Sequence, residues 1–171
     1  MELAIRNKWI TIRGSSVVKD LNENDVLKVQ GKFWTFTRKK FVKELDDTLL
    51  FTVRNKFWAF FVKKAYVYDK DGNVVANIRR KFFSLHDRYF IDSTYGNFEI
   101  KGNILQFNYQ ILLNGKEVGH IARKISLRDS FVLTINEEEI DYKFMVALVI
   151  AIDNITDQRE QENSSSFSSD Y

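Results

Sequence analysis

The stretch Phe144-Met145-Val146-Ala147-Leu148-Val149-Ile150-Ala151-Ile152 contains no polar side chain. It follows Asn136-Glu137-Glu138-Glu139, which has the features of a helix start. Asn136 can accept hydrogen bonds from free backbone amides, and Glu139 stands three residues later, as in a capping box. The sequence therefore predicts a helix from about Asn136 to about Asp157. A helix that is apolar on every face must be buried on every face, so the rest of the chain has to enclose it.

Five repeated units precede this helix. Each unit is anchored on a basic residue before a bulky apolar pair, and three anchors match closely: Lys32-Phe33-Trp34, Lys56-Phe57-Trp58 and Lys81-Phe82-Phe83. Two more match loosely: Asn103-Ile104-Leu105 and Lys124-Ile125-Ser126. The position three before and the position one after each anchor are apolar in every unit. These positions are Val29, Val53, Ile78, Ile100 and Ile121, and Phe33, Phe57, Phe82, Ile104 and Ile125. Apolar residues at even spacing indicate strands with one buried face.

Turn signals separate the strands. Asp71-Gly72-Asn73 and Asn114-Gly115 are typical of hairpins, because glycine and asparagine tolerate a positive φ angle. Each unit thus contains two strands, and a further pair is predicted before them at Lys8–Arg13 and Val17–Lys19, turning at Gly14-Ser15-Ser16. The sequence predicts about twelve strands between residues 8 and 135.

The expected fold is mainly β, a closed antiparallel barrel of about twelve strands around a central apolar C-terminal α-helix. Closure removes the exposed edges of consecutive hairpins. A barrel of about eight strands is already filled by its own side chains, so twelve strands leave room for the helix. We expect one domain over residues 1–157 and a disordered, polar, serine-rich tail over residues 158–171.

Composition limits the function classes. The 171 residues include no cysteine, which excludes disulfides, thiol catalysis, zinc ribbons and iron–sulfur clusters. The two histidines, His86 and His120, lie in a predicted turn and a predicted strand, where a surface or hydrogen-bonded role is the usual one. Asp69-Lys70-Asp71-Gly72-Asn73 lacks the spacing of a calcium loop, and no phosphate-binding or nucleophile motif occurs. We therefore predict no enzymatic activity, no cofactor and no metal.

No targeting signal is evident. Glu2 stands where a signal peptide carries basic residues, and the longest strongly apolar run is the nine residues of Phe144–Ile152. A membrane-spanning helix needs about 20 apolar residues. The sequence predicts a cytoplasmic protein with no transmembrane segment.

Charge is unevenly distributed. The net charge is +3, but residues 1–90 hold 19 Lys and Arg against 10 Asp and Glu, and residues 91–171 hold 7 against 13. In an up-and-down barrel, turns within units lie at one end and turns between units at the other. The first end, the basic rim, collects Arg13-Gly14-Ser15, Arg38-Lys39-Lys40, Lys63-Lys64, His86-Asp87-Arg88, Gln106-Phe107 and Arg128-Asp129. The second end, the acidic rim, collects Asp20–Asp25, Asp46-Asp47, Asp69–Asp71, Asp92, Asn114-Gly115 and Glu137-Glu138-Glu139.

The basic rim is the candidate binding site. Its anion-binding candidates are Arg38, Lys39, Lys40, Lys43, Lys63 and Lys64. The aromatic residues Trp34, Trp58 and Phe61 lie close by in sequence and are candidates for a membrane interface. The helix should point its negative end, with Asp153 and Asp157, at this rim and partly neutralise it. The plainer interpretation is that these charges belong to ordinary solvated turns.

The sequence resembles the LURP-one-related family, a branch of the tubby C-terminal-like superfamily, in its bacterial-type members. The resemblance covers about residues 3–156. It rests on Val29-Gln30-Gly31-Lys32-Phe33-Trp34, Asp71-Gly72-Asn73-Val74-Val75-Ala76-Asn77-Ile78, Phe98-Glu99-Ile100-Lys101-Gly102 and Val149-Ile150-Ala151-Ile152-Asp153. It implies the tubby fold, a barrel around a C-terminal helix. Tubby proteins bind phosphoinositides and scramblases are distant relatives, so it implies a lipid role by analogy alone.

These observations predict a binding module that attaches weakly to an anionic membrane surface or lipid headgroup, at the inner face of the membrane. The alternative is an intracellular protein-interaction or scaffold domain with no lipid ligand. Basic residues beside aromatic ones would also suit single-stranded nucleic acid, which we consider the less favoured partner. A carrier of small ligands is disfavoured because the helix fills the barrel.

Overall fold

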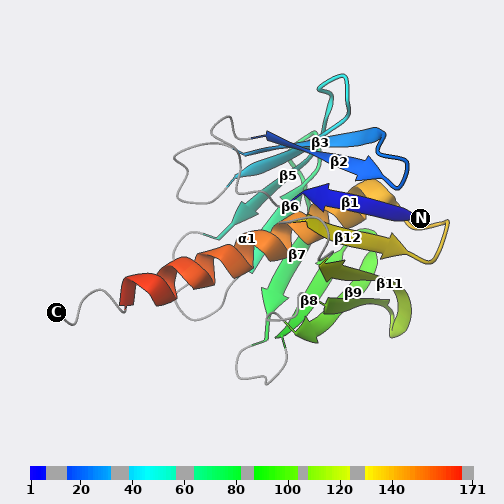
Figure 1. Cartoon of the computed structure of the whole chain (residues 1–171). Coiled ribbons are helices and arrows are strands. Elements are labelled where there is room, and N and C mark those ends of the chain that lie inside the picture. The colour runs from blue at the N-terminus through cyan, green and yellow to red at the C-terminus, as the bar shows by residue number, and fades with distance from the viewer. Residues whose placement is uncertain are drawn as a thin grey trace.

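The computed structural model describes residues 1–6, 15–31, 39–56, 64–81, 87–103, 108–123 and 130–166. This part of the chain forms twelve strands followed by one helix (Figure 1). The elements are β1 (Glu2–Arg6), β2 (Ser15–Asp20), β3 (Asp25–Gly31), β4 (Lys40–Lys43), β5 (Leu49–Asn55), β6 (Lys64–Tyr68), β7 (Val74–Arg80), β8 (Asp87–Ser93), β9 (Gly96–Asn103), β10 (Asn108–Leu113), β11 (Lys116–Arg123), β12 (Ser130–Ile135) and α1 (Tyr142–Ser166).

The strands form a closed antiparallel barrel, as the repeats predicted. Each strand pairs with its neighbour in sequence, and β1 pairs with β12 to close the ring. The closing register aligns Leu3 with Leu133 and Ile5 with Phe131. Closure satisfies the backbone groups that an open sheet would leave at its two edges.

Buried and more exposed side chains alternate along strands such as β4, β6 and β8. The position three before each repeat anchor, Val29, Val53, Ile78, Ile100 and Ile121, is buried in every unit. The position one after each anchor lies outside the described residues. Gly119, two residues before Ile121 in the fifth unit, is also buried, and a Cβ atom there would come within 2.3 Å of the Thr134 carbonyl oxygen on β12.

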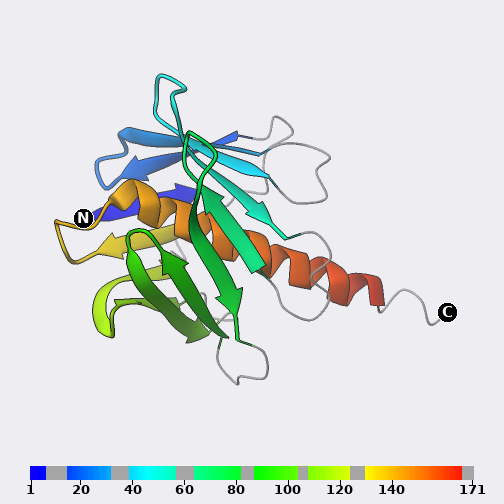
Figure 2. The same cartoon turned by 180° about the vertical axis from the view of Figure 1, so that it is seen from behind.

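Helix α1 runs through the barrel, and its C-terminal part projects beyond the strands (Figure 2). Every residue from Phe144 to Thr156 is buried, and Leu148 is 0% exposed. The helix packs against β4, β5, β6 and β12. The nine-residue apolar stretch is therefore enclosed on all sides by strands, as its composition required.

The start of the helix differs from the prediction. The helix begins at Tyr142, and its cap is Asp141 in place of Asn136. The Asp141 carboxylate accepts hydrogen bonds from the backbone amides of Lys143 (2.9 Å) and Phe144 (3.3 Å). An aspartate in this position satisfies amides that have no partner within the helix. Residues 136–140 form the turn that leads into it.

The end of the helix also differs. The sequence predicted an end near Asp157, but the helix continues to Ser166. Residues 158–162, Gln-Arg-Glu-Gln-Glu, all favour helix. Extending a helix that is already formed requires no new nucleation, so these residues continue it. Residues 167–171 of the predicted tail lie outside the described residues.

The first strand was predicted in the wrong place. Glu2–Arg6 fills the position that Lys8–Arg13 was expected to fill, with Leu3 and Ile5 facing inward. These two residues have the same alternation as the repeats, which the prediction overlooked. Ser15 and Ser16, expected in a turn, belong to β2. The whole predicted strand at Lys8–Arg13 falls within residues 7–14, which lie outside the described residues.

Candidate functional site

The two charged rims lie at opposite ends of the barrel. All neighbouring strands are antiparallel, so the even-numbered strands all run in one direction and the odd-numbered strands run in the other. The even-numbered strands therefore all begin at the same end of the barrel. Lys39 and Arg88 stand where β4 and β8 begin, whereas Asp46 and Asp71 stand in turns that follow β4 and β6. Glu137 follows β12 at this second end. The predicted separation is confirmed for these residues, and Lys63 and Arg128 lie outside the described residues.

The basic rim is held by backbone contacts between strand ends. The Lys56 amide donates to the Lys64 carbonyl oxygen at 2.9 Å, and the Lys81 amide donates to the Arg88 carbonyl oxygen at 2.8 Å. Lys56 and Lys81 are exposed and Lys64 is half-buried. Three lysines are thus fixed at the ends of β5, β6 and β7, which are neighbours around the barrel.

The structure separates the six predicted anion-binding residues. Lys39 and Lys64 lie on the basic rim, and the Lys39 ammonium sits 5.0 Å from the centre of the Phe41 ring. Lys43 ends β4 and lies toward the acidic rim, because this four-residue strand spans the wall from Lys40 to Lys43. Lys40 is only 9% exposed and faces the interior. Arg38, Lys63, Trp34, Trp58 and Phe61 lie outside the described residues.

Lys56 and Lys81 also belong to the basic rim, although they were not among the predicted site residues. Both are repeat anchors and precede the aromatic residues that marked the repeat. The signal was present, because each anchor ends the first strand of its unit and so stands beside the turn at the basic rim. The anchors were treated as features of the repeat alone.

Inside this end of the barrel, polar side chains connect the wall to the helix. The Lys40 ammonium forms an ion pair with Asp153 at 3.0 Å, and the two side chains are 11% and 8% exposed. The Asn55 amide donates to the Asn154 carbonyl oxygen at 3.0 Å, and the hydroxyls of Tyr89 and Thr156 lie 3.4 Å apart. The Lys40–Asp153 pair provides part of the expected neutralisation, but through a side chain in the middle of the helix. The negative end of the helix is not at this position, because α1 continues to Ser166.

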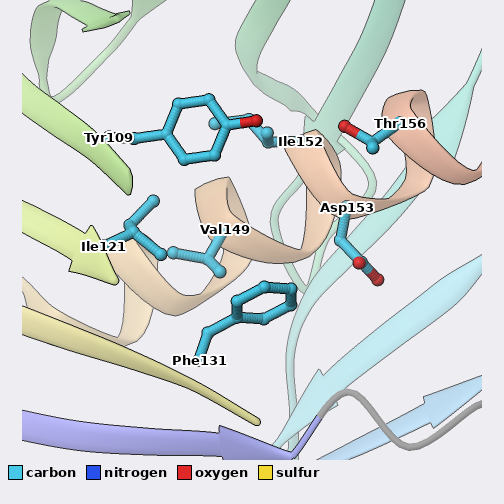
Figure 3. A pocket seen from close by; sticks show the side chains of 7 residues that line it. All are labelled: Tyr109, Ile121, Phe131, Val149, Ile152, Asp153 and Thr156. Carbon is cyan, nitrogen blue, oxygen red and sulfur yellow. The ribbon is translucent and has the colours of Figure 1, made fainter. Parts of the chain in front are cut away.

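A small cavity lies between the helix and β10, β11 and β12. Its volume is about 20 Å³, and its lining residues are Tyr109, Ile121, Phe131, Val149, Ile152, Asp153 and Thr156. Figure 3 shows Tyr109, Ile121 and Phe131 pointing from their strands toward the helix. A water molecule needs roughly 10–15 Å³, so the cavity can hold a water molecule and is too small for a lipid chain.

At the acidic rim, carboxylates organise the turns. Asp69 accepts hydrogen bonds from the backbone amides of Asp71 (3.0 Å) and Asn73 (2.8 Å), and Gly72 has a φ angle of 87°. This confirms a hairpin turn in place of a calcium loop. Asp20 and Asp46 accept backbone amides in the same way in their own turns.

These hydrogen bonds predict a specific behaviour in acid. They lower the pKa of Asp69, first through the Asn73 side chain, and lower the pKa of Asp20 and Asp46 as well. A carboxyl whose pKa is lower in the folded state stabilises the fold above its unfolded pKa, and that contribution is lost as the pH falls through the folded value. We expect carboxyl titration by NMR to place all three values below 3.8, the ordinary aspartate value. Replacing Asn73 with alanine should move the Asp69 pKa back up. A value at or above 3.8 for Asp69 in the unmodified protein would contradict the turn geometry.

Two further properties concern the described residues only. They contain no group of three or more His, Cys, Asp or Glu side chains placed to hold a metal ion. Among the same residues, no helix combines the length and apolar character needed to cross a membrane.

The fold and the rims define a class of protein, a closed twelve-stranded antiparallel barrel threaded by a C-terminal helix. The family model described as LURP-one-related matches residues 1–153, so the chain belongs to this family. The barrel is similar to the crystal structure of a protein from Arabidopsis thaliana, with a TM-score of 0.63 and 18% identity over 91% of this chain and 90% of that one. This likeness shows the fold alone. The comparison with curated proteins found no match.

Proposed function

We propose that this protein is a non-catalytic binding module that attaches weakly to anionic membranes, at the cytoplasmic face, through Lys39, Lys56, Lys64 and Lys81 of the basic rim. The observation that supports the proposal is the charge of this rim. Within the described residues, Lys56, Lys64 and Lys81 form no ion pair, whereas lysines near the acidic rim pair with Asp25, Asp47, Glu44 and Glu137. Lys56, Lys64 and Lys81 therefore present positive charge that no ion pair within the described part of the chain neutralises.

The electrostatic free energy that these lysines can contribute is consistent with reversible attachment. A lysine near an anionic surface contributes about 1 kcal/mol, so three or four give weak binding. The attraction between exposed charges is screened beyond about 8 Å at physiological salt, so binding should weaken as salt rises. Lys40 contributes little because Asp153 neutralises it within the barrel. The resemblance to the tubby fold supports a lipid ligand by analogy.

Replacing Lys56, Lys64 and Lys81 together with serine should weaken binding to anionic vesicles by about 100-fold, the equivalent of three contributions of about 1 kcal/mol. The measurement is flotation with phosphatidylserine-containing vesicles at two salt concentrations. Lys70→Ser is the matched control, because Lys70 is an exposed lysine in the β6–β7 turn at the acidic rim. The control should bind like the unmodified protein.

Equal affinity for neutral and anionic vesicles, or affinity for neither, would overturn the membrane proposal. A protein-interaction role would then be the leading alternative, and pull-down from cell extract would test it. An equal loss in Lys70→Ser would show that net charge, not the rim, controls attachment.

A further inference from the structure

The last part of α1 leaves the barrel at the basic rim. The helix starts at the acidic rim, where Lys143 in its first turn pairs with Glu44 at the end of β4. It reaches the basic rim at Thr156, whose hydroxyl lies 3.4 Å from that of Tyr89 near the start of β8. Residues 157–166 continue the helix and project beyond the strand ends (Figure 2). We call residues 157–166 the C-terminal arm.

The C-terminal arm is acidic. Three carboxylic acids, Asp157, Glu160 and Glu162, outnumber its one basic residue, Arg159, so its net charge is −2. The last turn of the helix holds no basic residue, so the negative end of the helix dipole adds to this charge. A helix rises about 1.5 Å per residue, so the arm extends about 15 Å, and Glu160 stands about 6 Å along the axis from Thr156. The acids therefore begin at the level of the basic rim and continue outward from it.

The barrel wall beside the arm carries the opposite charge. The helix packs against β4, β5 and β6, so it leaves the barrel on the side where these strands end or begin. Lys56 follows β5 and Lys64 begins β6, and neither lysine forms an ion pair within the described part of the chain. Asp87, the acid at a described strand end of this rim, pairs with Arg80. The arm therefore brings negative charge to the side of the rim that the lysines make positive.

An anionic surface that approaches Lys56 and Lys64 meets the carboxylates of the arm at the same time. Along the helix axis, Asp157 and Glu160 lie within the roughly 8 Å over which exposed charges act at physiological salt. Like charges repel, so each acid opposes the attraction that a nearby lysine provides. We infer that the C-terminal arm is an acidic regulatory element that limits attachment of the basic rim to anionic membranes. This regulation rests on the proposed function, because it acts on the same lysines.

The test changes the charge of the arm in the full chain and keeps its length and helix-forming residues. Glu160→Gln combined with Glu162→Gln should strengthen binding to phosphatidylserine-containing vesicles by about tenfold at low salt. Gln158→Glu combined with Gln161→Glu should weaken binding by a similar factor. Glutamate and glutamine have similar size and similar helix propensity, so charge is the property that changes. Vesicle flotation measures both effects, which should shrink as salt rises.

Glu138→Gln combined with Glu139→Gln is the matched control, because both glutamates are exposed at the acidic rim and the net charge changes by the same amount. This variant should bind like the unmodified protein. If the unmodified protein binds and the Glu160→Gln, Glu162→Gln variant binds no more tightly, the regulatory role is overturned and the membrane-binding rim stands. An equal gain in the control variant would also overturn it. If none of these proteins binds anionic vesicles, the proposed function fails and the regulatory role fails with it.

Discussion

Replacing Leu148 with aspartate is expected to prevent the protein from folding in soluble form. Leu148 is 0% exposed and lies in the middle of the buried part of α1, within the barrel. A carboxylate placed there would be removed from water with no partner designed for it, which costs several kcal/mol. That loss is a large part of the roughly 5–15 kcal/mol that stabilises a typical domain.

Solubility on expression and thermal unfolding followed by circular dichroism measure this effect. Leu148→Met is the matched control, because it keeps the volume and apolar character and should cost less than about 1.5 kcal/mol. A Leu148→Asp protein that remains soluble and melts cooperatively near the temperature of the unmodified protein would show that the helix does not need its apolar environment.

The second large effect is expected at the buried ion pair between Lys40 and Asp153. Asp153→Leu leaves the Lys40 ammonium buried without the carboxylate that lies 3.0 Å away. Removing one partner of a buried pair typically destabilises a protein by about 3–5 kcal/mol, because the remaining charge is uncompensated. The long lysine side chain can recover part of this loss by extending toward the rim.

A double-mutant cycle distinguishes the pair from its separate residues. Combining Asp153→Leu with Lys40→Met removes both charges, so the double variant should be more stable than Asp153→Leu alone. The measured quantity is the free energy of unfolding from urea titration. Purely additive losses would mean that the two groups do not interact in the folded protein.

The sequence predicted the architecture because it contains two clear hydrophobic patterns. Alternation around Val29, Val53 and Ile78 predicted strands, and the absence of any polar residue between Phe144 and Ile152 predicted an enclosed helix. Both signals depend on burial, which the barrel imposes on every unit alike. The number of strands and the separation of the rims followed from hairpin order alone.

Local features were harder to predict because nearby residues offered equivalent signals. Asn136 and Asp141 are both good caps, and only the geometry of the turn selects Asp141. Leu3 and Ile5 have a strand pattern as good as that of Lys8–Arg13, and pairing with β12 selects them. Propensity alone does not rank such alternatives, because tertiary contacts decide between them.

The site was only partly predicted, since lysine was assumed to be exposed. Lys40 has the same alternation as Val42, two residues later on β4, and Val42 is 0% exposed. That alternation placed Lys40 inside the barrel, and the apolar surroundings of Asp153 indicated a buried acid that needs a cation. Lys43 lies away from the basic rim because it stands three residues after Lys40 on β4, and each residue of a strand advances the chain by about 3.3 Å toward the other end of the barrel.

The order of elements along the chain has a consequence for synthesis. All twelve strands are synthesised before the helix that fills their interior. The second edge of β1 stays unpaired until β12 has been synthesised. Until then, the nascent chain exposes apolar strand faces and an open edge, the features that favour aggregation. The first strand therefore gains its second hydrogen-bonded neighbour only when the last strand has been made.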